Sequence, residues 1–240
     1  FSHLINPIHF LNKYMLKKNI NIKMKKKELC IFFLFLLINL TSQEAKHMIV
    51  LSSEGSLIDN QFLSDKEIDG VTETNEIIKI TESGTYTLGG DYQGQVLVEL
   101  DDENGEVTLI LSGINITNPD APGILITKAN EIDKTSYSRQ NPITYEKAKN
   151  LDFTHAGIKL IIADNSKNYV NAGYFDKYQG AVFSKVSMVI SGEEKGDGEL
   201  TVIGDNEGLD TKMHLQINGG NLNIVANDDA INVNEDYGSV

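Results

Sequence analysis

Cysteine and tryptophan are almost absent from this chain of 240 residues, which has one cysteine, no tryptophan and four prolines. The cysteine, Cys30, lies in an apolar run near the N-terminus, so the rest of the chain can form neither a disulfide nor a cysteine zinc site. Its stability must come from packing and from bound ions.

Signatures of common enzymes are also missing. The sequence contains no His-Glu-x-x-His, no phosphate-binding loop, no dinucleotide fingerprint and no Gly-x-Ser-x-Gly. Zinc protease, nucleotide-dependent and α/β-hydrolase chemistry are therefore disfavoured.

Basic residues are scarce relative to acids, with 21 Lys and Arg against 34 Asp and Glu. Residues 1–45 hold seven of the basic residues and two of the acids, so the rest has 14 basic and 32 acidic residues and a net charge of −18. Such a surface repels nucleic acids and membrane headgroups and attracts cations. We expect no nucleic-acid partner.

The N-terminal part indicates export. Met24 is followed by three lysines and then by ten apolar residues over 29–38, which predicts a signal peptide over 24–45 and leaves 1–23 as possible untranslated upstream sequence. The alternative, a membrane anchor, needs about 20 apolar residues. We expect a monomer that is secreted or on the cell surface, with no membrane span after signal removal.

The composition and residue pattern of the remaining chain change near residue 77. Residues 46–76 are acidic and Ser-rich, which predicts a loosely structured lead with a short helix around 59–65. From 77 to 240, short runs alternate between apolar and polar residues and are separated by Gly, Asn and Asp, as in an all-β domain.

These runs repeat. Apolar residues recur at a spacing of 27 and then 22, and a polar insertion over 193–197 accounts for the difference of five. The stacked sets are Val182 with Leu209 and Ile231, Met188 with Leu215, Ile190 with Ile217, Leu200 with Leu222, and Val202 with Ile224. This repeat predicts a right-handed parallel β-helix, with a β-sandwich as the alternative. Residues 128–155 are polar and form a projecting loop, and the pattern still in progress at Val240 suggests C-terminal truncation.

Two segments of this pattern resemble a known family. These are Glu-Ser-Gly-Thr-Tyr at 82–86 and Leu-Ser-Gly-Ile-Asn-Ile-Thr-Asn at 111–118, supported by Leu-Gln-Ile-Asn-Gly-Gly at 215–220. The chain from 77 onward resembles the secreted carbohydrate-binding family built on a pectate-lyase-like β-helix, and it departs from that family in the loop over 131–153. The resemblance implies bound calcium and affinity for cellulose and pectic acid without demonstrated cleavage.

An acidic turn occurs twice, at 205–210 and at 227–232. Stacking places acids of adjacent strands about 4.8 Å apart, where they repel unless a cation lies between them, and calcium prefers these oxygen donors. The predicted Ca²⁺ ligands are Asp205, Glu207, Asp210, Asp228, Asp229 and Asn232. The alternative is that these residues only satisfy turn backbone groups.

Candidate sugar-binding residues flank these turns. Lys185 and Lys212 each follow a stacked apolar residue by three positions, and Tyr174 and Tyr178 lie in an aromatic stretch. The lysines can pair with sugar carboxylates and the rings can stack on sugars; the alternatives are surface lysines and a packed corner.

Three functions remain. The first is non-catalytic, calcium-dependent binding of acidic or cellulosic polysaccharide, the second a calcium-dependent polyuronate lyase, and the third a structural or adhesive stalk. A lyase needs a base, and the candidates are Arg139, the chain's only arginine, and Lys185 or Lys212. A hydrolase would need carboxylates such as those of Asp210, Asp228 and Asp229. We favour binding and assign no catalytic residue.

Overall fold

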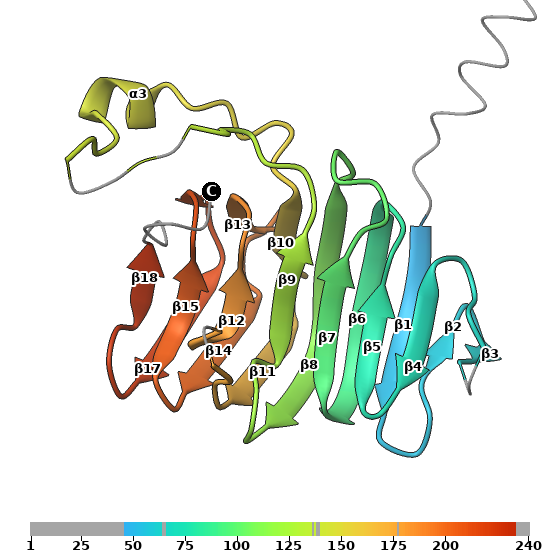
Figure 1. Ribbon diagram of the computed structural model, residues 1–240. Coiled ribbons are helices and arrows are strands. Elements are labelled where there is room, and N and C mark those ends of the chain that lie inside the picture. The colour runs from blue at the N-terminus through green and yellow to red at the C-terminus, as the bar shows by residue number, and fades with distance from the viewer. Residues whose placement is uncertain (1–45, 64–65, 136, 138–139, 177, 234–240) are drawn as a thin grey trace, which may run out of the picture. The chain divides into compact units, whose positions relative to one another are not determined.

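The computed structural model describes residues 46–63, 66–135, 137, 140–176 and 178–233, and this part of the chain is nearly all β (Figure 1). The strands are β1 (Lys46–Ser52), β2 (Leu57–Ile58), β3 (Gln61–Phe62), β4 (Val71–Thr74), β5 (Ile77–Ile80), β6 (Gly84–Gln93), β7 (Gln95–Glu99), β8 (Val107–Asn118), β9 (Ile124–Lys128), β10 (Ile158–Ile162), β11 (Lys167–Ala172), β12 (Gly180–Ser184), β13 (Met188–Gly192), β14 (Glu199–Gly204), β15 (Glu207–Thr211), β16 (Leu215–Ile217), β17 (Asn221–Ala226) and β18 (Ile231–Val233). A short helix, α3, spans Tyr145–Lys149. No helix in these described ranges is long and apolar enough to cross a membrane.

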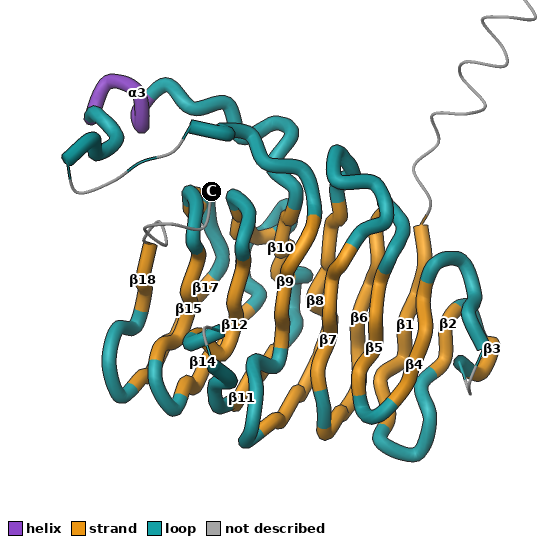
Figure 2. The backbone as a smooth tube through the Cα atoms, in the orientation of Figure 1, coloured by secondary structure: helices purple, strands orange, loops and turns teal. Residues whose placement is uncertain are grey.

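The strands form two sheets that face each other (Figure 2). The seven-stranded sheet has the order β18-β15-β12-β9-β7-β5-β4, and every pair in it is parallel except β4 with β5. The eleven-stranded sheet has a main path β16-β13-β10-β8-β6-β1-β2-β3 and a branch in which β11 pairs with β8 and β14, and β14 with β17. From β10 onward, consecutive strands belong to the main path, to the branch and to the seven-stranded sheet in turn, and this order of three strands then repeats.

The branch arises because two long strands bend. The pairing of β6 with β8 shifts register between Leu88 and Gly90, where Gly90 and, in β8, Gly113 have positive φ angles of 109° and 81°. A Cβ on Gly90 would lie 2.3 Å from the carbonyl oxygen of Leu51, so only glycine fits there. Before the bend β8 pairs with β10, and after it with β11.

The predicted stacking of apolar residues is confirmed. Each stacked set consists of register partners in adjacent parallel strands: Val182 with Leu209, Leu209 with Ile231, Met188 with Leu215, Ile190 with Ile217, Leu200 with Leu222, and Val202 with Ile224. The insertion over 193–197 lies in the turn between β13 and β14 and leaves these pairs intact.

The inward side chains of most of the strands form one apolar core. Val182 and Leu209, for example, are 0% and 1% exposed, and burying a side chain of this size stabilises the fold by about 1.5–3 kcal/mol. This core positions the outward residues of the same strands, since neighbours in a strand point to opposite faces.

The prediction of a loosely structured lead is wrong for the described part of 46–76. Strand β1 pairs in parallel with β6 over seven residues, and its inward residues Ile49 and Leu51 are 0% and 2% exposed. The expected helix is absent from 59–63, where Asp59 and Asn60 form the turn between β2 and β3. Residues 64–65 lie outside the described residues. The predicted signal peptide over 24–45 also lies outside them. The lead continues the sheets because its alternate apolar residues can cover the end of the core.

The polar segment between β9 and β10 does project as a loop, seen at the upper left of Figure 1. Its helix α3 begins at the N-cap Thr144, whose side chain accepts a hydrogen bond from the Lys147 amide. The helix is one and a half turns long and has no buried residue, so contacts at the ends of the loop must hold the segment in place.

Candidate functional site

The outer face of the seven-stranded sheet brings the predicted residues together. In this sheet Leu209 points into the core, so its neighbour Asp210 points outward, as the alternation predicts. Phe183 and Asn232 are the register partners of Asp210 in β12 and β18. An aromatic ring, a carboxylate and an amide therefore lie side by side on successive strands.

Both predicted lysines lie against aromatic rings in this region. The rings of Tyr178 and Phe183 meet edge to face with centroids 5.0 Å apart. The Lys185 Nζ is 5.6 Å from the Tyr178 centroid, and the Lys212 Nζ is 5.6 Å from that of Phe183 and 3.4 Å from Asp210 Oδ2. We call Tyr178, Phe183, Lys185, Lys212 and Asp210 the cation–aromatic cluster. Cations over aromatic faces contribute about 0.5–2 kcal/mol each.

Two carboxyl groups lie together here, that of Glu207 and that of Asp210 in the cluster itself. Glu207 is 4% exposed and Asp210 is fully buried, and the amide of Asn232 donates a 2.6 Å hydrogen bond to Glu207 Oε1. Burial, and then a hydrogen bond and charge repulsion from Asp210, raise the pKa of Glu207 to about 7, against the opposing effects of Asn232 and Lys212. Glu207 can therefore exchange a proton, or a cation, near neutral pH.

The other predicted metal ligands are at the rim. The turns stack as expected: Asn227 Nδ2 donates to the Asp205 carbonyl at 2.8 Å, and the amide of Asp228 donates to the Asn206 carbonyl at 2.9 Å. The side chains of Asp205, Asp228 and Asp229, however, are exposed. The six predicted ligands thus separate into a covered set, which consists of the buried Glu207 and Asp210 and the half-buried Asn232, and an exposed set of three acids.

Tyr174 lies on the turn after β11 and is half exposed. The turn continues to Phe175, whose main chain pairs with that of Tyr178 through two hydrogen bonds of 3.1 and 2.9 Å. These bonds fix the turn that carries Tyr178 into the cluster, and they leave Tyr174 on its outer side.

The projecting loop is fastened to the corner beside the cluster. Glu131 accepts hydrogen bonds of 2.6 and 2.7 Å from the amide and hydroxyl of Ser187. Asp133, which is 8% exposed, accepts from the Tyr137 hydroxyl at 2.5 Å, pairs with the Lys147 Nζ at 2.9 Å and lies 3.5 Å from His214 Nε2. We call these contacts the loop latch. Burial opposes ionisation of Asp133, but hydrogen bonds from Thr135, Tyr137 and Lys147 outweigh it and hold the pKa of its carboxyl well below the ordinary value.

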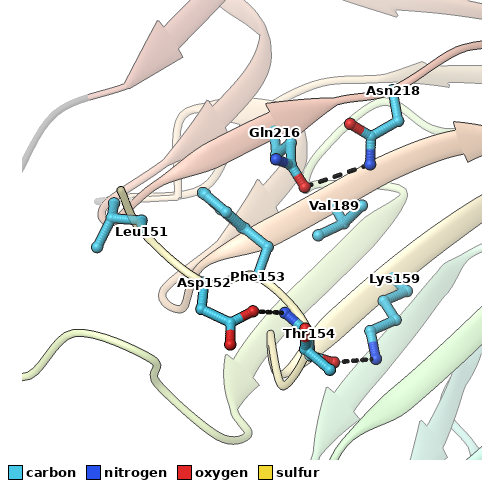
Figure 3. A pocket seen from close by; sticks show the side chains of 8 residues that line it. All are labelled: Leu151, Asp152, Phe153, Thr154, Lys159, Val189, Gln216 and Asn218. Atoms are coloured by element: carbon cyan, nitrogen blue, oxygen red, sulfur yellow. Dashed lines mark hydrogen bonds between the residues drawn. The ribbon is translucent and has the colours of Figure 1, made fainter. Parts of the chain in front are cut away.

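Beyond the latch, the returning loop and the eleven-stranded sheet enclose an open hollow of about 480 Å³ (Figure 3). The loop contributes Leu151, Asp152, Phe153 and Thr154; β10, β13 and β16 contribute Lys159, Val189 and Gln216, and Asn218 directly follows β16. Lys159 is held by Glu106 at 3.1 Å and by the Thr154 carbonyl at 2.7 Å. Phe153 and the bonded pair Gln216–Asn218 therefore offer a ring and amide groups to solvent.

Sequence reasoning missed the latch and the hollow. The available signals were Phe153, an apolar residue within a polar loop, and the outward polar residue Gln216 in a predicted strand. Neither is specific, because the residues that meet here come from segments far apart in the chain. Arg139, the candidate base in this loop, lies outside the described residues.

Comparison with known proteins supports a carbohydrate-binding assignment. A carbohydrate-binding domain-containing protein of Acetivibrio thermocellus is 28% identical over 176 residues, which are 71% of this chain and 52% of that protein, so the chain spans about half the length of this relative. A solved structure, described as a polysaccharide lyase-like protein from C. thermocellum in a gadolinium derivative, matches with a TM-score of 0.54 and 24% identity over 74% of this chain and 60% of the other. That similarity supports the fold alone. The family model of carbohydrate-binding domain-containing proteins matches residues 74–237, most of the chain, and the chain therefore belongs to that family.

Proposed function

We propose that this chain is an exported, non-catalytic protein that binds acidic polysaccharide on the outer face of its seven-stranded sheet. The observation that carries the proposal is the cation–aromatic cluster, in which Lys185 and Lys212 lie over the rings of Tyr178 and Phe183. Sugar-acid chains present carboxylates beside apolar ring faces, and this cluster offers a partner for each.

The aromatic and lysine side chains of the proposed site have different parts in binding. Phe183 is 1% exposed and supports the site from below, whereas Tyr178 is half buried and Tyr174 is 50% exposed, so the tyrosines are the rings that a sugar can reach. Lys185 and Lys212 are half buried, which limits their motion and lowers the entropy lost on binding a carboxylate.

Calcium is proposed as the bridge between the protein and the sugar. Glu207 and Asp210 supply buried oxygen atoms, Asn232 is half-buried, and Asp205, Asp228 and Asp229 supply exposed carboxylates nearby along the stacked turns. Calcium takes six to eight such oxygens and accepts ligands from sugar as well as protein. Because the pKa of Glu207 is about 7, calcium and a proton compete for this carboxylate.

The fold proposed for this binding surface is a right-handed, pectate-lyase-like parallel β-helix. The support is the repeating round through parallel strands, with register partners such as Leu209 and Ile231 in successive rounds. A strand ladder of this kind presents outward side chains at a regular spacing of about 4.8 Å, which suits a polymer of repeating units.

The test is retention of the protein by polygalacturonate and by cellulose, with calcium and with chelator. We expect polygalacturonate to retain the protein in calcium and to release it in chelator. Replacing both lysines (Lys185→Ala with Lys212→Ala) should weaken binding at least about tenfold, and Lys195→Ala, which removes an exposed lysine in the turn after β13, should have no effect.

Three outcomes would overturn the proposal. Equal retention of the double variant and the Lys195→Ala control would place binding elsewhere. Release of unsaturated uronide, detected by its ultraviolet absorbance, would show that the protein is a lyase rather than a binder. Retention by neither polymer in either condition would leave only the structural stalk.

A further inference from the structure

The N-terminal end of the fold carries a second group of polar side chains, far from the cation–aromatic cluster in sequence. His47 lies in β1, Asp59 in the turn between β2 and β3, and Asp69 in the turn before β4. Antiparallel pairing of β1 with β2 brings the Asp59 turn to the start of β1, and Asp69 Oδ2 lies 4.0 Å from the Nδ1 atom of His47. In the described ranges, no other group of three or more His, Cys, Asp or Glu side chains has its ligand atoms close enough together to hold one metal ion.

The distances among the three side chains fit a shared ion. His47 Nδ1 lies 2.7 Å from Asp59 Oδ2 and 4.0 Å from Asp69 Oδ2, and the three ligand atoms are all within 4.8 Å of one another. Ligands bound at about 2.0–2.2 Å around one tetrahedral ion are about 3.3–3.6 Å apart, so the His47–Asp59 pair would open slightly and Asp69 would move inward to complete the site.

Two of the three side chains are held in place by other contacts. The His47 ring stacks on Tyr86 with centroids 5.4 Å apart, and the Tyr86 hydroxyl donates to the Glu82 carbonyl at 3.0 Å. Asp59 Oδ1 accepts a 2.9 Å bond from the Met48 amide, which leaves Oδ2 directed at the imidazole. His47 is 13% exposed at its side chain and Asp69 is 58% exposed, so an ion would have a fixed inner side and an open outer side.

The three donor atoms favour some metal ions over others. Calcium prefers oxygen ligands alone, and three protein donors are too few to enclose it. One imidazole nitrogen with two carboxylates suits zinc and neighbouring first-row divalent ions, with water in the remaining positions.

We propose that His47, Asp59 and Asp69 form a zinc-type site for one divalent transition-metal ion, separate from the calcium proposed above, and that this ion fastens the first strand of the fold. The ion would join the start of β1 to the turn after β2 and to the turn before β4, and the β1–β2 pairing itself has only two register pairs. It would therefore stabilise this end of the core against opening, because metal binds the assembled turns and not the unfolded chain.

The test is calorimetric titration of the full chain, made without a polyhistidine tag, with Zn²⁺ in the presence of excess Ca²⁺. We expect one equivalent to bind and to raise the melting temperature by several degrees. Co²⁺ should bind with visible absorption bands that are lost on adding Zn²⁺, which reports coordination directly. Asp69→Asn should weaken Zn²⁺ binding at least about tenfold while leaving the protein folded, His47→Gln should abolish it, and Glu54→Gln, which changes an exposed acid in the turn after β1, should have no effect.

Failure of wild-type protein to bind Zn²⁺ would overturn the proposal, as would equal affinity in wild type, Asp69→Asn and His47→Gln. Displacement of Zn²⁺ by equimolar Ca²⁺ would also contradict it, since an oxygen-only site would then be responsible. None of these results bears on polysaccharide retention, so this proposal and the proposed function fail independently.

Discussion

Glu207 and Asp210 are both buried on β15, close enough for charge repulsion from Asp210 to help raise the pKa of Glu207. Two carboxyl groups this close cannot both be ionised at low cost, so one retains a proton near neutral pH or a cation replaces it. Proton and cation binding at this pair are therefore linked.

The first prediction concerns pH. Burial and then Asp210 raise the pKa of Glu207 from 4.5 to about 7. Between these values the folded state binds more protons than the unfolded state, so in chelator the free energy of unfolding should fall as pH rises from 5 to 8, by up to about 3 kcal/mol. Denaturant titrations at several pH values measure it.

Glu207→Gln should flatten that part of the pH profile and should weaken any stabilisation by calcium. Asp205→Asn, which changes an exposed acid in the same turn, should retain the wild-type slope. The same slope in wild type and Glu207→Gln would show that the buried pair does not cause the pH dependence.

The second prediction concerns the stack of Leu209 and Ile231. The two residues are register partners, but Leu209 is 1% exposed and Ile231 is 43% exposed. Leu209→Ala should lower the free energy of unfolding by about 2–4 kcal/mol because it leaves a cavity, and Ile231→Ala by less than about 1 kcal/mol. Equal losses, measured by denaturant unfolding, would contradict the buried position of Leu209.

The third prediction concerns Gly180, the residue of β12 beside Glu207. A Cβ at Gly180 would lie 2.7 Å from the Cβ of Asp210 and 2.8 Å from its amide nitrogen, so alanine would push β12 and β15 apart. Gly180→Ala should destabilise the protein by about 1–3 kcal/mol. Gly219→Ala, whose Cβ would approach no closer than 3.7 Å to the nearest atom, is the matched control and should be neutral or slightly stabilising. A thermal melt in which both variants match wild type would refute this close approach.

The fourth prediction concerns the loop latch. Because the pKa of Asp133 is depressed, its stabilising effect is present above the ordinary pKa and is lost only as pH falls through the lower folded value. Asp133→Asn should therefore free the loop at neutral pH and increase protease cleavage within it about tenfold, since a hydrogen bond to a charged group contributes about 1.5–3 kcal/mol.

Glu146→Gln is the control for the latch, because Glu146 is an exposed acid in helix α3 of the same loop. Its cleavage rate should equal that of wild type. If Asp133→Asn is cleaved no faster than Glu146→Gln, other contacts hold the loop.

The spacing of apolar residues was the most informative part of the sequence. It predicted the register of Val182, Leu209 and Ile231 because a strand that slips by one residue would expose its whole apolar face. The same logic placed Asp210 outside. The lead segment was misread because acids and serines hide the short alternation of Ile49 and Leu51.

The six predicted calcium ligands differ in burial, and the spacing of residues in the sequence does not show which side chains are buried. Asp210 and Glu207 are covered, whereas Asp205, Asp228 and Asp229 are in solvent, although all belong to two similar stretches of sequence. The aromatic partners of Lys185 and Lys212 were also unpredictable in detail, because ring contacts depend on side-chain directions across strands.

By itself, the sequence determined the all-β class, the spacing of the repeats and which residues alternate toward the core, because these follow from local periodicity. Only the tertiary structure decided which distant side chains meet: Asp133 with His214 at the latch, Glu207 with Asn232 under the cluster, and His47 with Asp59 and Asp69 at the first strand. Contacts of this kind depend on how loops and turns fold back on the sheets, and no local pattern in the chain encodes that path.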